Sequence, residues 1–417
     1  MKPPCLASYF SSEMRSFGAF TVLVLFLLSL MPAPAHAGLK NAAPLTLLPP
    51  GKVRALAPLL RANDVTLIES EPSGQMKQVS MFTLVAASPS QVRDTLLDAA
   101  RYIDSMRNFK SSKVTQRPDG TFDHFYELSY GLFSVDGTNR YVSLPADPSS
   151  DAPPVEMFDV DEGPGGTRHY RFEFYSAAGA TVVAMYGFTN VRNSGGLVAK
   201  LFQRIPQLEH GMALVSQATL LFSIKHRAEQ VAGSTPLLPA AGNAPYDALL
   251  ERGVVVLLRS QNGRLSDLSM IDQSAAPPLG LAAWIKQIGS WSAVVPSITR
   301  SEPTGQSDDI ASYDIEQALP LLSFRTSYGA RVSVLGQNTS IDMMGLSGDL
   351  KGSRLRWDVT PGRSAASQVV LRSSVQFDRG SLVMRQLYKT EPLMEYGVNV
   401  GLQLVILRGL KLRAEQR

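Results

Sequence analysis

Hydrophobic and polar positions alternate over much of the chain, and the period of the alternation changes at definite places. Near the start, "VTLIES" from Val65 and "QVSMFTLVA" from Gln78 flank the turn residues 71–75, a pattern that predicts a β-hairpin. Ser88-Pro89 then offers an N-cap with a first-turn proline, which predicts the start of a helix. The apolar positions of this helix share one face: Val92, Leu96, Ala99 and Ile103.

The middle of this region consists of alternating segments separated by turn residues. Asp136-Gly137 and residues 163–166 are the expected turns, so the segments predict a meandering antiparallel sheet. The segments are "FDHFYELSYGLFSV", "RYVSL", "VEMFDVD", "HYRFEFYS" and "TVVAMYGFTNV". From about Leu208 to Arg227 the chain is apolar on more than one side, which predicts a long helix buried against that sheet.

The whole series occurs twice. "GQMKQVSMFTLVAASP" from Gly74 matches "GRLSDLSMIDQSAAPP" from Gly263 at an offset of 189 residues. "RAEQ" from Arg227 returns from Arg413 at an offset of 186 residues, so one structural unit is written twice. We expect unit one at 46–230, a Pro/Ala/Gly-rich linker region at 231–245, and unit two at 235–417, which includes the later part of that linker.

Unit two repeats the predicted elements of unit one. Its hairpin consists of "VVVLLRS" and "LSMIDQSA" around an Asn262-Gly263 turn. Its helical stripe is Leu281, Trp284, Ile285, Ile288 and Trp291. Its strands are "IASYDIEQ", "SFRTSYG", "RLRWDVT", "SQVVLRSSVQF" and "LVMRQLYK", and its last helix runs from about Met394 to the C-terminus.

The first 37 residues predict export. Phe20–Leu30 is an apolar run, and Ala35-His36-Ala37 places small residues at both cleavage-determining positions, as in a secretory signal peptide. We expect residues 1–37 to be removed and the chain to be exported, with the periplasm as its compartment. Cys5 is the single cysteine and lies in the removed segment, so no disulfide is expected. A net charge of +4 does not suggest a nucleic-acid binder.

The order of these elements resembles a known superfamily. A hairpin, an "AASP" or "AAPP" entry to a short helix with Tyr102 or Trp291 near its end, a strand meander and a long terminal helix look like the START-like helix-grip (SRPBCC) superfamily. The likeness is closest to its polyketide-cyclase and coenzyme-Q-binding branch. The resemblance implies an α+β fold of two tandem helix-grip units, each a curved antiparallel sheet wrapped around its C-terminal helix. It also implies an elongated apolar cavity in each unit.

Alternation along the strands indicates which side chains would line such a cavity. His169 opens a segment whose outward Arg171 and Glu173 are expected to meet water. The inward side chains, with those of the last helix and their unit-two counterparts, are Phe122, His124, Tyr126, Tyr130, Tyr170, Phe172, Phe174, Met212, Val215, Thr219, Phe222, Tyr313, Ile315 and Trp357. The alternative interpretation is an ordinary core filled with aromatic side chains.

His124 is the inward group that could carry out proton chemistry near neutral pH. No carboxylate shares its strand face, so a histidine satisfied by a tyrosine hydroxyl or a water is the more ordinary interpretation. Its counterpart in unit two is Tyr313, which means that the two interiors have different chemistry. "DVDEGPGG" from Asp159 lacks the spacing of a calcium loop and is expected to be a solvated turn.

The stretch "SGGLVAKLFQRIP", residues 194–206, reads as a small basic amphipathic helix. Its apolar face consists of Leu197, Val198, Leu201, Phe202 and Ile205. Two interpretations stay open: a lid that opens transiently against a membrane surface, or a helix that caps the core.

Three functions remain in view. The first is an exported, non-enzymatic carrier of an apolar ligand such as a lipid, a sterol or an isoprenoid quinone. The second is an enzyme of the polyketide cyclase or aromatase kind that uses His124, and the third is a structural or partner-binding protein with filled cavities. The sequence offers no catalytic elbow, no metal-ligand spacing and no phosphate loop, so no catalytic residue, metal or cofactor is predicted.

Overall fold

The computed structural model describes residues 44–106, 109–130, 133–160, 167–190, 207–233, 246–261, 264–319, 322–362, 366–375, 385 and 394–416. The predicted signal peptide, the amphipathic stretch 194–206 with all five of its apolar residues, and residues 234–245 of the linker region lie outside these ranges. The predicted turns at 163–166 and 262–263 lie outside them as well.

The elements of the first half follow the predicted order of hairpin, helix, meander and long helix. They are α2 (Pro50–Arg54), α3 (Ala57–Leu60), β1 (Asp64–Ser70), β2 (Met76–Val85), α4 (Pro89–Leu97), η2 (Ala99–Arg101), α5 (Tyr102–Ser105), β3 (Phe109–Gln116), β4 (Phe122–Tyr130), β5 (Phe133–Ser143), β6 (Ala152–Asp159), β7 (Thr167–Ala177), β8 (Ala180–Asn190) and α7 (Gln207–Ala232).

The second half has the same order. Its elements are α8 (Asp247–Leu250), β9 (Val254–Gln261), β10 (Arg264–Ser274), α9 (Pro278–Lys286), η4 (Ile288–Ala293), β11 (Ile298–Ser307), β12 (Ile310–Leu319), β13 (Leu322–Leu335), β14 (Asn338–Gly348), β15 (Arg354–Pro361), β16 (Ser367–Ser374) and α11 (Met394–Glu415).

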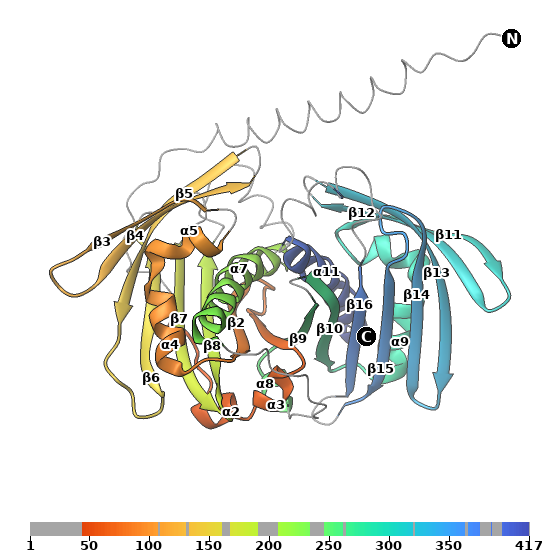
Figure 1. The fold of residues 1–417 in the computed structure, drawn as a ribbon. Coiled ribbons are helices and arrows are strands. Elements are labelled where there is room, and N and C mark those ends of the chain that lie inside the picture. Colours follow the sequence, from red (N-terminus) through yellow and green to blue (C-terminus); the bar gives the residue numbers. More distant parts are fainter. Residues whose placement is uncertain are drawn as a thin grey trace, which may run out of the picture.

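The described strands form one 16-stranded antiparallel sheet in the order β11-β12-β13-β14-β15-β16-β10-β9-β1-β2-β8-β7-β6-β5-β4-β3. The two halves meet at β1 and β9, where Leu67 lies opposite Val255. Each half is therefore a hairpin followed by a meander that returns to the hairpin's second strand, and the halves join edge to edge (Figure 1).

The long helices α7 and α11 pack against each other between the two halves of the sheet (Figure 1). α7 also packs on β2, β8 and α4, whereas α11 packs on β10 and α9. We call the face of the sheet that carries these helices the inner face. Buried side chains from both halves form one continuous hydrophobic cluster there, so the two units share a core.

The first helix confirms its predicted start and corrects its predicted length. The Ser88 hydroxyl accepts a hydrogen bond from the Gln91 backbone, and the Gln91 side chain accepts one from the Ser88 backbone, a complete capping box. The helix ends at Leu97, so Ile103 does not continue its apolar face and is 44% exposed. Tyr102 is buried instead, because the 3₁₀ turn η2 changes the angular step between the two segments.

The predicted turn at Asp136-Gly137 was wrong, because both residues lie inside β5. Gly137 pairs with Tyr126 of β4, and Asp136 pairs with Glu127. A Cβ atom on Gly137 would lie 2.6 Å from the Tyr126 hydroxyl oxygen, so glycine is needed there for the neighbouring ring and not for a turn.

Three strands were missed in the sequence. β3 and β11 are the edge strands of the sheet, and their exposed, polar residues give little alternation to detect. In β14 the buried Ile341 and Met343 do alternate with less buried residues. The strand was missed because polar residues and glycines make up much of its sequence. Apart from Arg385, the predicted strand "LVMRQLYK" lies outside the described residues.

Candidate functional site: a polar row on the inner face of unit one

The inner face of unit one carries a row of polar side chains that crosses four strands. His124 of β4 lies opposite Asn139 of β5, and Asn139 lies opposite Asp159 of β6. Directly opposed residues point to the same face of a sheet. Arg168 of β7 completes the row, because its backbone N–H and its guanidinium both donate to Asp159.

His124 is held in one tautomer by its neighbours. The Ser112 hydroxyl donates its hydrogen to the Ala99 carbonyl at 2.6 Å, so Ser112 Oγ can only accept at His124 Nε2, 2.8 Å away. The proton of the neutral ring is therefore on Nε2. Nδ1 is left as an acceptor, and it has no hydrogen-bond partner among the described residues.

Aromatic rings surround the His124 imidazole, which is 1% exposed. The Tyr102 ring meets it edge-on at 5.4 Å between centroids, and the Phe109 ring stacks parallel to it at 6.2 Å. The Tyr141 ring lies 6.1 Å away. Burial among these rings lowers the pKa of His124 to about 4, so the imidazole is neutral at pH 7.

Asn139 presents a second buried acceptor beside His124. Asn139 is 7% exposed, and its Oδ1 has no hydrogen-bond partner in the described part of the chain. A buried polar atom without a partner costs about 1–3 kcal/mol. The row thus presents two such acceptors on directly opposed residues.

Arg168 and Asp159 form a buried ion pair at the end of the row. Arg168 Nη2 lies 2.8 Å from Asp159 Oδ1, and the two side chains are 17% and 5% exposed. Burial works against the charge, yet the carboxylate of Asp159 keeps the pKa of Arg168 well above its usual value. The expectation that Asp159 belongs to a solvated turn was wrong, because the carboxylate points inward to this arginine.

Tyr126 connects the ion pair to the aromatic side chains. Its hydroxyl accepts a hydrogen bond from Arg168 Nη2, and the Arg168 guanidinium carbon lies 5.4 Å from the centroid of the Tyr126 ring. Gly137 leaves the space that the Tyr126 ring occupies. Burial raises the pKa of Tyr126, so its hydroxyl keeps its hydrogen at neutral pH.

The predicted lining residues fall into three groups. Eight of the predicted residues that lie on strands are buried: Phe122, His124, Tyr126, Tyr170, Phe172, Phe174, Ile315 and Trp357. Tyr313 is partly buried against the core. The side chains of Tyr130 and Met212 lie outside the described set. Val215 and Phe222 of α7 lie toward α11 instead of the sheet, since Phe222 contacts the Tyr396 ring at 5.5 Å. Thr219 donates to the Val215 carbonyl.

Unit two keeps the supports of the row but not its chemistry. Ser301 donates to the Ile288 carbonyl as Ser112 does to Ala99, and Trp291 donates to Ile285 as Tyr102 does to Leu96. The row itself consists of Tyr313 opposite Tyr328, and Tyr328 opposite Gly345. The imidazole, the amide and the ion pair are therefore particular to unit one.

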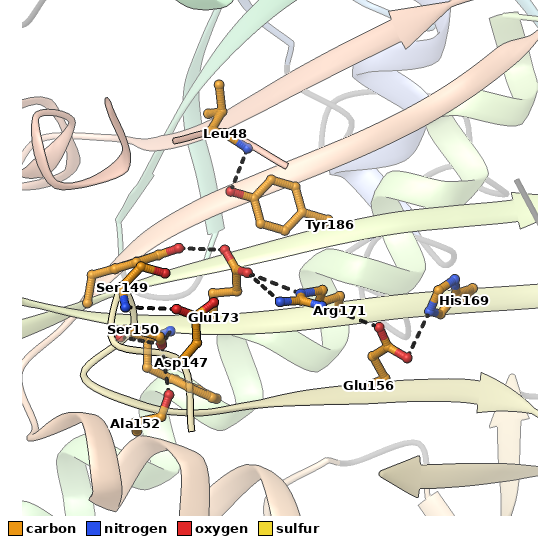
Figure 2. Close-up of polar contacts among 12 residues, drawn as sticks. Leu48, Asp147, Ser149, Ser150, Ala152, Glu156, His169, Arg171, Glu173 and Tyr186 are labelled. Carbon is orange, nitrogen blue, oxygen red and sulfur yellow. Dashed lines mark hydrogen bonds and ion pairs between the residues drawn. The ribbon is translucent and has the colours of Figure 1, made fainter. Parts of the chain in front are cut away.

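The outer face of the sheet also differs between the units. In unit one it is covered by residues 44–60, and the Leu48 backbone donates to the Tyr186 hydroxyl (Figure 2). Glu173 is 5% exposed under this cover and contacts Arg171, so the expectation that Glu173 meets water was wrong. Figure 2 shows Arg171 reaching on to Glu156, which also contacts His169.

The corresponding surface of unit two forms an open groove of about 780 Å³. It includes Arg259 and Arg372. The equivalent residues of unit one are Glu69 and Tyr186, respectively. A smaller pocket of about 170 Å³ is lined by Ile315 and polar residues of β11–β13. Neither contains a residue of the polar row.

Comparisons with known proteins concern the fold. No protein-family model matches the chain, and no curated protein matches it. The chain is similar in structure to the di-domain ARO/CYC StfQ from the steffimycin biosynthetic pathway, with 14% identity and a TM-score of 0.30 over 81% of this chain and 98% of that chain. It is also similar to a STAR-related lipid transfer protein from Xanthomonas axonopodis (11% identity, TM-score 0.33, 42% of this chain and 96% of that chain). A third similar structure is human STARD10, with 9% identity and a TM-score of 0.31 over 38% of this chain and 69% of that chain.

One arrangement of elements is present in two tandem copies, and solved structures of START-related proteins are similar to it. Each copy has the hairpin, the short helix, the meander and the long terminal helix in the predicted order. The predicted α+β class is confirmed as well. Identities of this size say nothing about which molecule the chain handles.

Two searches of the described residues bear on other kinds of site. Among them no group of three or more histidine, cysteine, aspartate or glutamate side chains is placed to hold a metal ion. No helix in the same residues has the length and apolar character needed to cross a bilayer.

Proposed function

We propose that unit one binds one amphipathic small molecule on the inner face, with its polar end at the His124–Asn139 row. The observation that carries this proposal is the pair of buried acceptors His124 Nδ1 and Asn139 Oδ1, which have no hydrogen-bond partner among the described residues and lie on directly opposed residues. Buried polar groups in folded proteins are almost always hydrogen-bonded, so two neighbouring exceptions indicate a missing partner.

The surroundings of the row suit the apolar part of such a ligand. Tyr141 and Phe109 present rings next to the imidazole, Phe122 stacks on Tyr141, and the buried Met157 lies opposite Tyr141. An apolar lining with a few placed polar groups is the usual composition of a small-molecule site. The finer part of the fold prediction, a curved sheet that wraps the long helix and leaves an elongated space, belongs to this proposal.

The proposed role is that of an exported carrier of a lipid, a sterol, an isoprenoid quinone or a similar molecule. Export rests on the signal-peptide pattern of residues 1–37. Contact of residues 194–206 with a membrane surface remains part of the proposal, since a carrier must collect its ligand from somewhere.

A carrier fits the site better than an enzyme of the cyclase or aromatase kind. General-base catalysis near neutral pH needs a group with a pKa near 7, whereas burial lowers the pKa of His124 to about 4. Its Nε2 is held by the Ser112 hydroxyl and not by a carboxylate that could stabilise a charged imidazolium.

Native mass spectrometry of the mature protein, isolated from its natural compartment, tests the proposal. We expect one organic molecule per chain, identified after extraction, and its loss in the double variant His124→Phe/Asn139→Leu. Tyr328→Phe, a change at the unit-two position that corresponds to Asn139, is the matched control and should retain the molecule. An empty wild-type protein that also refuses added lipids, sterols and quinones would refute the carrier and favour a structural role.

A further inference from the structure

We infer that the polar group that unit one recognises is a neutral hydroxyl that donates a hydrogen bond, as in a sterol, a phenol or a quinol. This inference rests on the proposed function, because it concerns the ligand of the same row. It separates members of the proposed ligand classes that have similar size and apolar character: alcohols from acids, and quinols from quinones.

The tautomer of His124 supplies the first step. Ser112 has one hydroxyl hydrogen, and the Ala99 carbonyl receives it at 2.6 Å. The remaining contact between Ser112 Oγ and His124 Nε2 must then use the ring's own N–H as donor. Nδ1 consequently faces the interior as a lone pair, and the partner that satisfies it has to bring a hydrogen.

Asn139 supplies the second step. Its Oδ1 is also an acceptor, is also buried, and sits on the residue directly opposite His124. A group that offers only lone pairs, such as a carbonyl, a carboxylate or a phosphate, leaves both of these acceptors unsatisfied and can bond only to the Nδ2 hydrogens of Asn139. A group that carries a polar hydrogen satisfies one of the acceptors.

Tyr126 completes the complement of a hydroxyl. Its oxygen accepts from Arg168, so its own hydrogen remains to be donated, and the Tyr126 ring lies 6.1 Å from the His124 ring. A ligand hydroxyl can thus accept from Tyr126 and donate to His124 or Asn139. The Tyr126 donor beside the bare His124 Nδ1 acceptor matches an alcohol better than an anion, which has no hydrogen for Nδ1.

The only cation of the row does not change this conclusion. Arg168 is engaged by the Asp159 carboxylate through its Nε and Nη2 atoms and through its backbone N–H. The pair is neutral as a whole, so an acidic ligand would have to displace Asp159, a buried carboxylate, in order to be recognised.

Matched ligand pairs test the inference on the full mature chain. Equilibrium dialysis would compare 2-naphthol with 2-methoxynaphthalene and 2-naphthoate, and cholesterol with its methyl ether. Each ether keeps the apolar skeleton but has no hydrogen to donate. We expect each alcohol to bind at least about 5-fold more tightly than its ether and than the carboxylate, since an unmet buried acceptor costs at least that factor.

Variants show whether the discrimination comes from the row. His124→Phe should reduce the alcohol-to-ether ratio to nearly 1, whereas Tyr328→Phe in unit two should leave it unchanged. If His124→Phe does not fold, the ratio on the wild type decides alone. Equal binding of alcohol and ether, or tightest binding of the carboxylate, overturns the inference and leaves the carrier proposal intact. Binding of none of these probes also overturns it, while the native mass spectrum judges the carrier proposal separately.

Discussion

Gly211 of α7 and Gly397 of α11, equivalent residues of the two repeats, lie against each other where the two long helices cross. A Cβ atom on Gly211 would be 2.5 Å from the Gly397 carbonyl oxygen, and one on Gly397 would be equally close to the carbonyl of Gly211. The close approach of backbone to backbone joins the units at the helices, as β1 and β9 join them at the sheet. The repeat is thus a single folded body with an internal two-fold relationship.

Gly211→Ala should destabilise the protein by roughly 1–3 kcal/mol, the usual cost of forcing a methyl group into a filled interior. Chemical denaturation of the mature chain measures this. Gly280→Ala is the control, because a Cβ atom there would have its nearest neighbour at 3.8 Å in an exposed helix turn. We expect Gly280→Ala to be neutral or stabilising by up to about 1 kcal/mol. Equal effects of the two changes would mean that the helices do not cross at these glycines.

The glutamate of each "RAEQ" copy accepts a hydrogen bond from the backbone between the hairpin and the first helix of its unit. Glu229 Oε1 accepts from the Ala86 backbone at 3.0 Å, and Glu415 Oε1 accepts from the Ala275 backbone at 2.9 Å. Glu229→Ala leaves the Ala86 N–H without this acceptor and should cost about 1–3 kcal/mol, whereas Glu229→Gln keeps an oxygen and should cost less. Hydrogen exchange of the Ala86 amide should accelerate in Glu229→Ala. An unchanged exchange rate would contradict the assignment.

His124 should make the fold less stable in mild acid. Burial lowers its pKa from 6.5 to about 4 in the folded protein, so between these pH values only the unfolded chain takes up the proton. His124 therefore has no effect on the pH dependence of the free energy of unfolding above about pH 6.5. Below that, it lowers this free energy as the pH drops toward 4, by roughly 3 kcal/mol in total. The side chains that face the imidazole, Tyr102, Tyr126 and Tyr141, do not titrate in this range.

Urea unfolding at pH 7.5 and pH 4.5 checks this, with His124→Phe as the reference that lacks the ionisable ring. The wild type should lose about 2–3 kcal/mol more than His124→Phe between the two pH values. A loss of the same size in both proteins would show that His124 is not buried as a neutral ring.

The Arg168–Asp159 pair should respond very differently to one change and to two. Arg168→Met leaves the buried Asp159 carboxylate without its counter-charge and should cost about 3–5 kcal/mol. Adding Asp159→Leu removes that uncompensated charge, so the double variant should recover most of the loss. Thermal and chemical unfolding of the single and double variants measure the coupling. A double variant as unstable as Arg168→Met would argue against a buried ion pair.

Local patterns predicted a large part of the fold. Both hairpins, the Ser88 cap and the two long terminal helices depend on residues close together in the chain, where period and capping chemistry can be read directly. The edge strands β3 and β11 were missed because most of their side chains are exposed or only partly buried, so burial imposes little alternation on them. The turn at Asp136-Gly137 was predicted wrongly because Asp-Gly is a typical turn sequence, whereas here the glycine makes room for the Tyr126 ring.

The site was predicted only in part, for a physical reason. His124 and Tyr126 could be assigned to the inner face by alternation on one strand, and both are there. Asn139, Asp159 and Arg168 come from three other strands, and only the register of the sheet brings them into one row. The sequence contains no local signal for that register. The face of α7 was misplaced because a helix apolar on several sides does not reveal which side meets α11.

The central claim, that the polar end of a ligand meets His124, can be tested by ¹⁵N NMR of the histidine rings, assigned with His124→Phe. We expect a protonated Nε2 and a bare Nδ1 at pH 7. On saturation with an alcohol the Nδ1 resonance should shift, because that nitrogen then accepts a hydrogen bond. A bound ligand that leaves both His124 nitrogen resonances unchanged would place the binding site elsewhere and contradict the proposed contact with His124.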